Sequence, residues 1–364
     1  MQIRWLKYCL PLLVLTLAAV SFSGTGIRCW LPLIVAWIII PVLELILKPD
    51  ATNLEAAEEE MAKHSKAYDR VLYAVVLLQF PALYLFLHSV QEPGLSGMDM
   101  AGRILSMGLL CGMFGINVGH ELGHRVNRFE QTLAKASLLT SLYMHFFIEH
   151  NKGHHKRVAT REDPNSARFN EPVYLFYFRT IIFSYLSAWH IANDEVKKKG
   201  KRVVGIYNEM IQFHFIQAGF LALVYAVFGF TGLWCFGLAA LIGILLLETV
   251  NYIEHYGLQR RLQANGRYER AMPHHSWNSN HILGRLVLFE LSRHSDHHYL
   301  ASRKYQVLRH FDESPQLPTG YPGSMLLAMV PPLWFYIMNR KIRAIQIQQP
   351  EMAKPAAAAT SLAG

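Results

Sequence analysis

The chain has 364 residues, of which 52% are hydrophobic, and its formal net charge at pH 7 is +9. The hydrophobic residues gather in long runs, which excludes an ordinary soluble enzyme and predicts an all-α integral membrane protein. In chain order, six runs approach the roughly 20 residues that a spanning helix needs. These six predicted transmembrane helices cover 5–22, 27–47, 71–90, 104–119, 213–230 and 234–253.

The basic residues are distributed unevenly between the loops. Residues 120–210 hold 14 Lys and Arg, residues 254–364 hold 13 of the 35 in the chain, and the loop 91–99 holds none. Because basic loops stay on the cytoplasmic side, both large polar segments and both termini are expected there. This charge is explained by topology and attraction to anionic lipid, or by docking of an acidic protein, and no nucleic-acid partner is expected.

The expected organisation has five segments. Residues 1–119 form four spans, 120–210 a cytoplasmic segment, 211–253 two more spans, 254–346 a second cytoplasmic segment and 347–364 a disordered tail. Arg4 and Lys7, which precede the first run, also fit the start of a cleaved signal peptide. Apolar stretches at 133–148, 173–190 and 324–338 are expected to lie at the membrane surface.

Nine of the eighteen histidines recur in four short motifs on the predicted cytoplasmic side. The motifs read HELGHR at 120–125, EHNKGHH at 149–155, NYIEHYGL at 251–258 and RHSDHH at 293–298. Several of these histidines are three or four residues apart, so that a helix places them on one face. Packed imidazoles need partners when they are neutral and repel when they are charged, and a bound metal removes both difficulties. The nine predicted ligands are His120, His124, His150, His154, His155, His255, His294, His297 and His298.

The number of ligands indicates two metal ions. HELGH matches the HExxH pattern of zinc proteases, but such a site needs three protein ligands and leaves six histidines unexplained. Nine imidazoles suit two ions with four or five each, in a helical cytoplasmic cap on the spans. A metal transporter would instead place ionisable ligands within the membrane. Imidazole alone does not name the metal, because zinc, copper, iron and nickel all accept it.

The four motifs resemble the histidine boxes of the membrane alkane 1-monooxygenases, a family of the integral-membrane fatty acid desaturase and hydroxylase superfamily. NYIEHYGL distinguishes this family, and PHHSWNSNH at 273–281 and LPTGYPG at 317–323 extend the resemblance to residues 30–340. The resemblance implies a non-haem centre of two iron ions that uses O₂ to hydroxylate the terminal methyl of medium-chain n-alkanes in the bacterial inner membrane. It also implies that rubredoxin, served by an NADH-dependent reductase, supplies the electrons.

Other side chains receive roles beside the nine ligands. Glu121, Glu149, Glu254 and Asp296 are expected to accept hydrogen bonds from ligand imidazoles, with ordinary surface acids as the alternative. Glu248 lies in an apolar span, where an ionisable group suggests ligand support or proton delivery, with a neutral, purely structural glutamate as the alternative. His145, His274, His275 and His281 are expected to be structural or to support the ligands.

Two further hypotheses concern substrate and partner. Trp37 is expected either to limit alkane chain length, as a bulky residue does at this place in the family, or simply to pack between helices. The chain has no CxxC pair and therefore needs an external electron donor. Its docking surface is expected at Lys152, Lys156, Arg157 and Arg161. A xylene-type monooxygenase or a fatty-acyl desaturase remains the alternative within the superfamily.

Overall fold

The computed structural model describes residues 4–348, and residues 349–364 of the predicted tail lie outside this range. Five helices of the described residues are long and apolar enough to cross a membrane, namely Arg4–Ser23, Gly26–Ile46, Lys66–Ser89, Gly97–Gly123 and Glu209–His255. The first contains η1 (Arg4–Cys9) and α1 (Pro11–Ser23), and the second η2 (Gly26–Trp30), α2 (Leu31–Ile34), η3 (Val35–Ile39) and α3 (Ile40–Ile46). The others are α5 (Lys66–Ser89), then α6 (Gly97–Leu110) with η4 (Cys111–Ile116) and α7 (Asn117–Gly123), and α12 (Glu209–His255).

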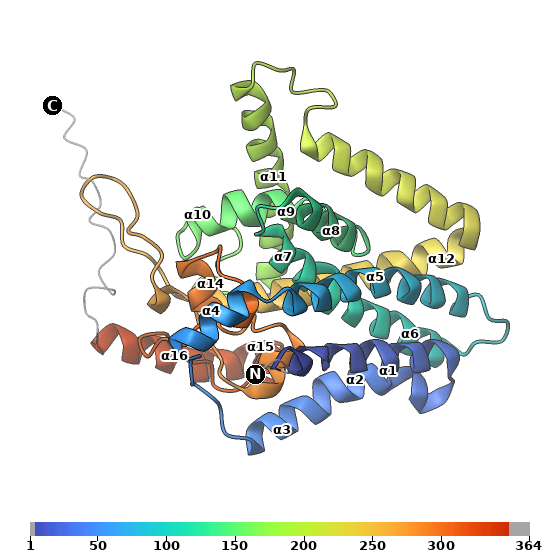
Figure 1. Ribbon diagram of the computed structural model, residues 1–364, viewed down its shortest axis with the longest axis horizontal. Coiled ribbons are helices and arrows are strands. Elements are labelled where there is room, and N and C mark those ends of the chain that lie inside the picture. Colours follow the sequence, from blue (N-terminus) through green and yellow to red (C-terminus); the bar gives the residue numbers. More distant parts are fainter. Residues whose placement is uncertain (1–3, 349–364) are drawn as a thin grey trace.

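The last two predicted spans are the two arms of α12. Gly229 has φ 62° and ψ −165°, outside the helical region, and an L side chain rarely adopts this conformation. The rings of Phe220 and Phe236 lie 5.7 Å apart, whereas 16 residues of straight helix extend over about 24 Å. The chain therefore folds back at Gly229, as Figure 1 shows. The gap between the predicted spans 213–230 and 234–253 lies within a few residues of this glycine.

Small residues bring the fourth span close to the second arm of α12. A Cβ added to Gly108 would lie 2.5 Å from the side chain of Ile242, and one added to Gly243 would lie 2.5 Å from Cβ of Cys111. Helices that approach this closely gain van der Waals contact, which drives their association in lipid. Because α7 directly follows η4, this packing also fixes the position of α7 relative to the end of α12 at His255.

Most of the remaining helices are short, and Figure 1 shows α10, α14, α15 and α16 together around one end of the long helices. In the first half of the chain they are α4 (Ala56–His64), α8 (Arg128–Leu139), α9 (Phe146–Ile148), η5 (Glu149–His154), α10 (His155–Arg157) and α11 (Val173–Lys198). In the second half they are η6 (Pro273–His275), α13 (Ile282–Val287), α14 (His294–Tyr299), η7 (Tyr305–Val307), α15 (Tyr321–Ala328) and α16 (Pro331–Gln348). Two of the stretches predicted to lie at the surface, 173–190 and 324–338, fall in α11 and in α15 with α16.

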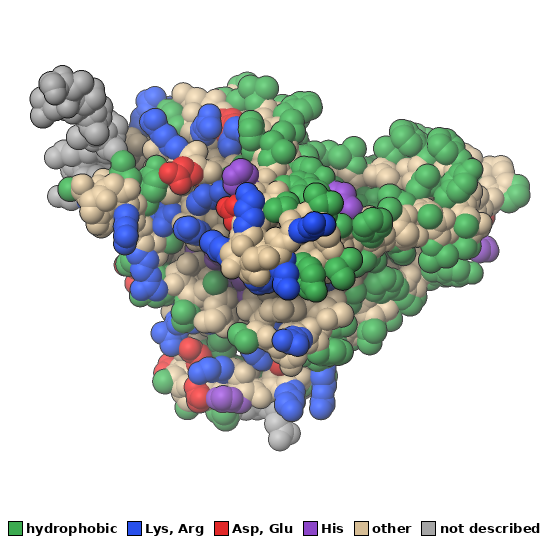
Figure 2. Space-filling model, turned by 90° about the horizontal axis from the view of Figure 1, so that it is seen from above, with side chains coloured by type: hydrophobic (Ala, Val, Ile, Leu, Met, Phe, Trp, Pro, Cys, Tyr) green, Lys and Arg blue, Asp and Glu red, His purple; other side chains and the backbone are tan. Residues whose placement is uncertain are grey.

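Charge and apolar surface are separated on the molecule. Figure 2 shows Lys and Arg side chains gathered over one part of the viewed face and hydrophobic side chains over the rest. Large apolar side chains on the long helices remain exposed, including Leu77 of α5 at 65% and Phe215 of α12 at 76%. Exposed apolar surface of this extent is compatible with lipid and not with water, so the chain is a membrane protein with a polar end.

Candidate metal centre

Four local structures present the nine predicted ligands. His120 lies in α7, and His124 follows one turn later as its C-terminal cap. His150 and His154 belong to η5, a π-helical turn that continues into His155 of α10. A π turn adds a residue to the helix and rotates the following side chains, and such turns are frequent at functional sites. The other four ligands are His255 at the end of α12 and His294, His297 and His298 in α14.

The nine imidazoles form two adjacent groups. The first group contains His120, His124, His150, His155 and His297, and the second contains His154, His255, His294 and His298. Within each group the candidate ligand atoms all lie within 4.8 Å of one another. The structure thus brings all nine predicted ligands together and divides them between two sites, a division that the sequence did not provide.

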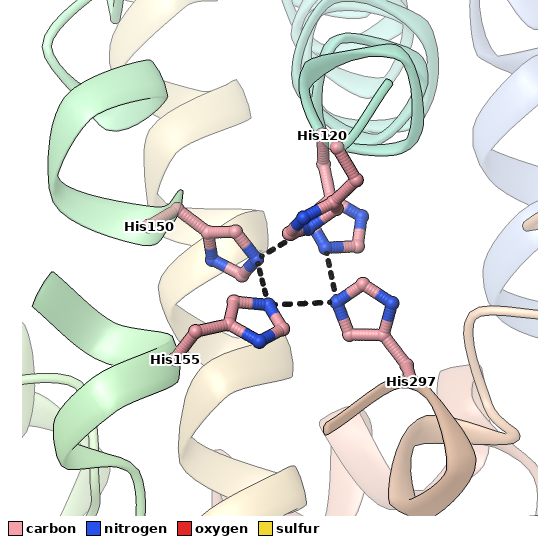
Figure 3. Close-up of side chains that lie close together, drawn as sticks. His120, His150, His155 and His297 are labelled. Atoms are coloured by element: carbon pink, nitrogen blue, oxygen red, sulfur yellow. Dashed lines mark hydrogen bonds between the residues drawn. The ribbon is translucent and has the colours of Figure 1, made fainter. Parts of the chain in front are cut away.

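The first group is a tight arrangement of ring nitrogens. Nε2 of His297 lies 2.9 Å from Nε2 of His120 and 3.0 Å from Nε2 of His155. Nε2 of His150 lies 3.0 Å from Nε2 of His155 and 3.1 Å from Nε2 of His124. Figure 3 shows four of these rings converging with their nitrogens on one space.

The second group has the same character. Nε2 of His298 lies 2.9 Å from Nε2 of His294 and 3.2 Å from Nε2 of His154, and Nε2 of His294 lies 3.2 Å from Nε2 of His255. A neutral ring nitrogen carries either one proton or one lone pair, so it cannot serve two such neighbours at once. A cation that accepts the converging lone pairs removes this conflict, and the donor set therefore fits a metal ion in each group.

Burial keeps most ligands in the neutral state that coordination needs. It lowers the pKa of six imidazoles outside the spans well below the ordinary value near 6.5, and neighbouring imidazoles add to the effect. These six are His124, His150, His155, His294, His297 and His298. The arrangement is prepared to offer lone pairs rather than protons at neutral pH.

Asp163 is a buried carboxylate that contacts the outer nitrogen of one candidate ligand, His154. Its Oδ2 atom lies 2.9 Å from Nδ1 of His154 and accepts a hydrogen bond of 2.6 Å from the hydroxyl of Ser166. Burial lowers the pKa of His154, but the charge and hydrogen bond of Asp163 together with the charge of Glu149 raise it, so that the net shift is upward. An acceptor at Nδ1 directs Nε2 toward a metal and increases its basicity. Asp163 is not among the residues predicted from the sequence; its only signal there is a polar turn, DPNS, shortly after the second motif.

Three of the four acids predicted to support the ligands have other partners. Glu121 accepts from Nη2 of Arg125 at 2.6 Å and from the backbone N–H of Tyr305 at 3.2 Å. Glu149 accepts from Nη2 of Arg157 at 2.8 Å. Asp296 accepts from Arg303 and from the backbone N–H of Arg309 at 2.7 Å. Among residues 4–348 these three carboxylates make no hydrogen bond to a ligand imidazole, so that they hold the surrounding elements rather than the rings.

Glu254 is the one predicted acid that touches a ligand. Its Oε2 atom lies 3.1 Å from Nε2 of His294, and its Oε1 atom accepts from the hydroxyl of Tyr321 at 2.8 Å. The contact is on the nitrogen that faces the other ligands and not on Nδ1. Glu254 therefore points into the site instead of supporting a ring from behind.

An apolar cavity leads to the two groups. His120, His150, His294 and Glu254 line one part of it, and the rest is built mostly from the long helices, α9, α13 and α15. The other lining residues are mostly hydrophobic and include Ala36, Trp37, Ile40, Leu109, Met113, Phe146, Leu246, Val250, Val287, Leu288 and Met325. The predicted substrate residue Trp37 thus faces the same cavity as three candidate ligands. Such a cavity suits a hydrocarbon that offers no polar group for recognition.

Comparison with known proteins agrees with this arrangement. Residues 100–325 match the fatty acid desaturase family. The alkane 1-monooxygenase of Acinetobacter baylyi is 41% identical over 329 residues, which are 90% of this chain and 80% of that protein. Alkane 1-monooxygenase 2 of Pseudomonas aeruginosa is 42% identical over 317 residues, 86% of this chain and 84% of that protein. The chain belongs to the alkane 1-monooxygenase family.

A more distant relative connects this family to a related activity. The hydroxylase component of the xylene/toluene monooxygenase of Pseudomonas putida is 27% identical over 249 residues, 67% of this chain and 64% of that protein. Family membership makes the chain a monooxygenase and removes the zinc-protease interpretation of HELGH. The geometry agrees, since the arginine and backbone partners of Glu121 leave it no role as a base that activates water.

Glu248, predicted to support a ligand or deliver protons, lies in a network of buried hydrogen bonds. Glu248 is buried and accepts hydrogen bonds from Tyr143 at 2.8 Å and from Nδ2 of Asn251 at 3.0 Å. The hydroxyl of Thr180 lies 3.0 Å from Oε2 of Glu248 and 2.7 Å from Oδ1 of Asn165. Asn251 lines the cavity.

This polar chain continues away from the cavity. Nδ2 of Asn165 donates to Oε2 of Glu149 at 2.7 Å, and Glu149 is paired with Arg157. Arg157 and Ser187 line a surface groove. A continuous row of polar side chains therefore joins the groove to the cavity, from Arg157 through Glu149, Asn165, Thr180 and Glu248 to Asn251.

The four histidines left unresolved by the sequence lie outside both groups. His145 packs against Tyr143, and His281 has Nδ1 3.0 Å from the hydroxyl of Ser279. His274 and His275 lie near Glu269 in a possible third group. The backbone N–H of Met272 donates to Nδ1 of His275, which puts the ring proton on Nε2 and leaves no lone pair there for a metal. A structural role therefore fits His275 better than coordination.

The predicted docking residues lie beside the second motif. Lys152 is paired with Glu195 at 2.7 Å, and Arg157 with Glu149. Lys156 and Arg161 are exposed and have no carboxylate partner among the described residues. Of the four predicted docking residues, Lys156 and Arg161 are therefore the ones whose charge is available to a partner.

Proposed function

We propose that this chain is a non-haem di-iron monooxygenase that converts medium-chain n-alkanes to 1-alkanols. The observation that carries the proposal is the apolar cavity that ends at imidazoles from both groups. The alkane 1-monooxygenase relatives support the substrate class. A cavity without a polar handle selects its substrate by length and shape, at roughly 0.8 kcal/mol for each buried methylene.

The reaction consumes one alkane, one O₂, two electrons and two protons, and it releases one 1-alkanol and one water. Iron ions held by the two histidine groups would supply the oxidising chemistry that breaks the terminal C–H bond. The protein binds the chain in the apolar cavity, directs its methyl end toward His120 and His294, and excludes water from the reacting end. Trp37 would close the cavity to longer chains. The all-imidazole donor set fits iron, and iron analysis distinguishes it from zinc.

Glu248 would take part in proton delivery. The supporting observation is the row of hydrogen bonds that joins the groove at Arg157 to the cavity at Asn251 through Thr180 and Glu248. The reaction needs two protons for each turnover, and an apolar cavity supplies none. This makes a buried polar route useful beside the metal site.

Rubredoxin, reduced by an NADH-dependent reductase, is the proposed electron donor. The expected location is the bacterial inner membrane, as the family resemblance implies, and the uneven distribution of Lys and Arg supports placing both termini and the metal site on the cytoplasmic side. Lys156 and Arg161 of that face would attract an acidic donor protein. Lys152 and Arg157, which are already paired, would contribute less.

Product analysis tests the proposal directly. The purified membrane protein, supplied with iron, rubredoxin, its reductase and NADH, is offered n-alkanes from hexane to hexadecane, together with xylene. We expect terminal alcohols from a limited range of alkanes and about two irons per chain. Aryl-methyl oxidation without alkane oxidation would favour the xylene-type activity, and an unsaturated acyl product would favour a desaturase. The absence of any terminal alcohol from an iron-replete preparation would contradict the proposal.

A further inference from the structure

Glu44 is a buried acid in the second span that has no part in the metal site. Its side chain is only 2% exposed. The Oε1 atom accepts a hydrogen bond of 2.7 Å from the backbone N–H of Gly284. The Oε2 atom is buried and has no hydrogen-bond partner within residues 4–348. A buried carboxyl group with one bond is costly, which calls for a reason beyond packing.

Two glycines make room for this carboxyl group. A Cβ added to Gly320 would overlap Oε2 of Glu44, and a Cβ added to Gly284 would lie 2.9 Å from Oε1. Gly320 has φ −60° and ψ 170°, which other residues adopt without strain. Its need for glycine is therefore steric and comes from Glu44.

The three residues belong to three walls of the cavity. Glu44 follows Ile40 by four residues within α3, so these two share one face, and Trp37 lies in the π-helical turn η3 that directly precedes α3. Ile40, Trp37 and Gly284 line the cavity. Gly320 directly precedes α15, whose Pro322 and Met325 also line it. The carboxyl group of Glu44 thus joins the span that carries Trp37 to α13 and α15.

We propose that Glu44 is a positioning residue for substrate selection. Its contacts with Gly284 and Gly320 hold the cytoplasmic half of the second span against α13 and α15, and thereby hold Trp37 at a fixed depth in the cavity. Glu44 sets the usable length of the cavity without touching the alkane. This inference rests on the proposed alkane hydroxylation, but it assigns a residue and a contact that the proposed function does not require.

The first test measures the chain-length profile of the full-length enzyme in lipid nanodiscs with rubredoxin, reductase and NADH. Glu44→Ala removes the contact with Gly284, while Glu44→Gln keeps an acceptor of the same length. We expect Glu44→Ala to change the ratio of kcat/KM between alkanes that differ by one methylene about fourfold, the factor that one buried methylene is worth. Glu44→Gln and the exposed control Glu60→Ala should keep the wild-type ratio, and iron content should stay constant in all three.

The second test is a double-mutant cycle on the thermal midpoint and on the same ratio. Gly320→Ala alone should lower the midpoint and shift the profile, because its methyl group displaces the carboxyl group. Adding Glu44→Ala removes the overlap, so the double variant should recover part of the lost midpoint and should show the profile of Glu44→Ala alone rather than the sum of the two shifts. Gly219→Ala is the matched control, because its added Cβ meets no atom within 4 Å.

The outcomes separate the two proposals. A wild-type enzyme that forms no 1-alkanol contradicts the proposed function. If the wild type forms alkanols and Trp37→Ser shifts the profile, but Glu44→Ala leaves it unchanged, Glu44 has no positioning role. Strictly additive losses from Gly320→Ala and Glu44→Ala would also overturn the inference. Loss of iron in Glu44→Ala would reassign the residue to the metal site.

Discussion

The carboxylate of Asp163 lies 2.9 Å from Nδ1 of His154, while Nε2 of the same ring faces His298 at 3.2 Å. His154 is thus held from behind by a buried acid and presents its other nitrogen to the second group. Both side chains are almost fully buried. Asp163 itself lies outside the four histidine motifs, yet it supports the candidate ligand His154.

Replacing Asp163 should weaken the second metal site. Asp163→Ala removes the acceptor at Nδ1, and such losses typically reduce metal affinity or activity 10-fold to 100-fold. We expect about one iron per chain after mild chelation, against about two in the wild type, measured by elemental analysis. The exposed control Asp194→Ala should retain both. Equal iron retention in Asp163→Ala and wild type would show that His154 binds without this support.

His275 should make stability depend on pH. Burial lowers its pKa to about 3, whereas in the unfolded chain it titrates near 6.5. Between these values the unfolded state binds the extra proton, so the contribution to stability is complete above pH 6.5 and is lost as the pH falls below it. The loss approaches about 1.4 kcal/mol per pH unit at most.

The measurement compares the thermal midpoints of wild type and His275→Asn between pH 7 and pH 5. Asparagine keeps an acceptor for the N–H of Met272 but does not titrate. The wild type should lose more stability than the variant over this range. Parallel curves would mean that His275 is protonated in the folded protein, against its buried position.

The helices and the ligand types follow from sequence patterns, because both depend on local spacing. Long apolar runs predict the spans, and histidines three or four residues apart indicate a metal site. The pairing of ligands does not follow: the neighbours His154 and His155 belong to different groups. Adjacent helical residues point about 100° apart, and distant segments decide which group each ring joins.

The partners of buried acids were equally hard to predict. Glu121 lies within the first motif, yet its partners are Arg125 and the backbone of Tyr305, which is 184 residues away. Asp163 is close to the second motif and does support a ligand, but nothing in its local sequence distinguishes it. Contacts between segments that are distant in the sequence decide these roles, and such contacts cannot be read from the pattern of a single sequence.

Thr180 offers a test of proton delivery through Glu248. Thr180→Val removes the hydroxyl between Asn165 and Glu248 with little change in shape, whereas Thr180→Ser keeps it. We expect Thr180→Val to lower kcat about 100-fold, the low end of what a proton-transfer group typically contributes. The measurement is alkanol formed per NADH consumed, with released hydrogen peroxide and the solvent isotope effect. A Thr180→Val enzyme as active and as coupled as Thr180→Ser would exclude this route.

Trp37 should limit the length of the alkane. Trp37→Ser removes a large ring from the cavity wall, so that chains too long for the wild type gain room. Each additional methylene that becomes buried favours the longer substrate about fourfold. Competition between alkanes of neighbouring length, followed by product quantification, measures the shift. An unchanged longest product would assign Trp37 to helix packing alone.

Charge reversal on the exposed basic residues tests the docking surface. Lys156→Glu with Arg161→Glu replaces two attractive charges that have no carboxylate partner among the described residues. An acidic donor should then associate more slowly, and KM for rubredoxin should rise about tenfold at low salt, with a weaker dependence on ionic strength. The control reverses Lys198 and Lys199 at the end of α11, which should leave both quantities unchanged. Reduction by dithionite bypasses docking and should give the same single-turnover yield in all variants. If rubredoxin KM and its salt dependence do not change in the Lys156 and Arg161 variant, the donor binds elsewhere.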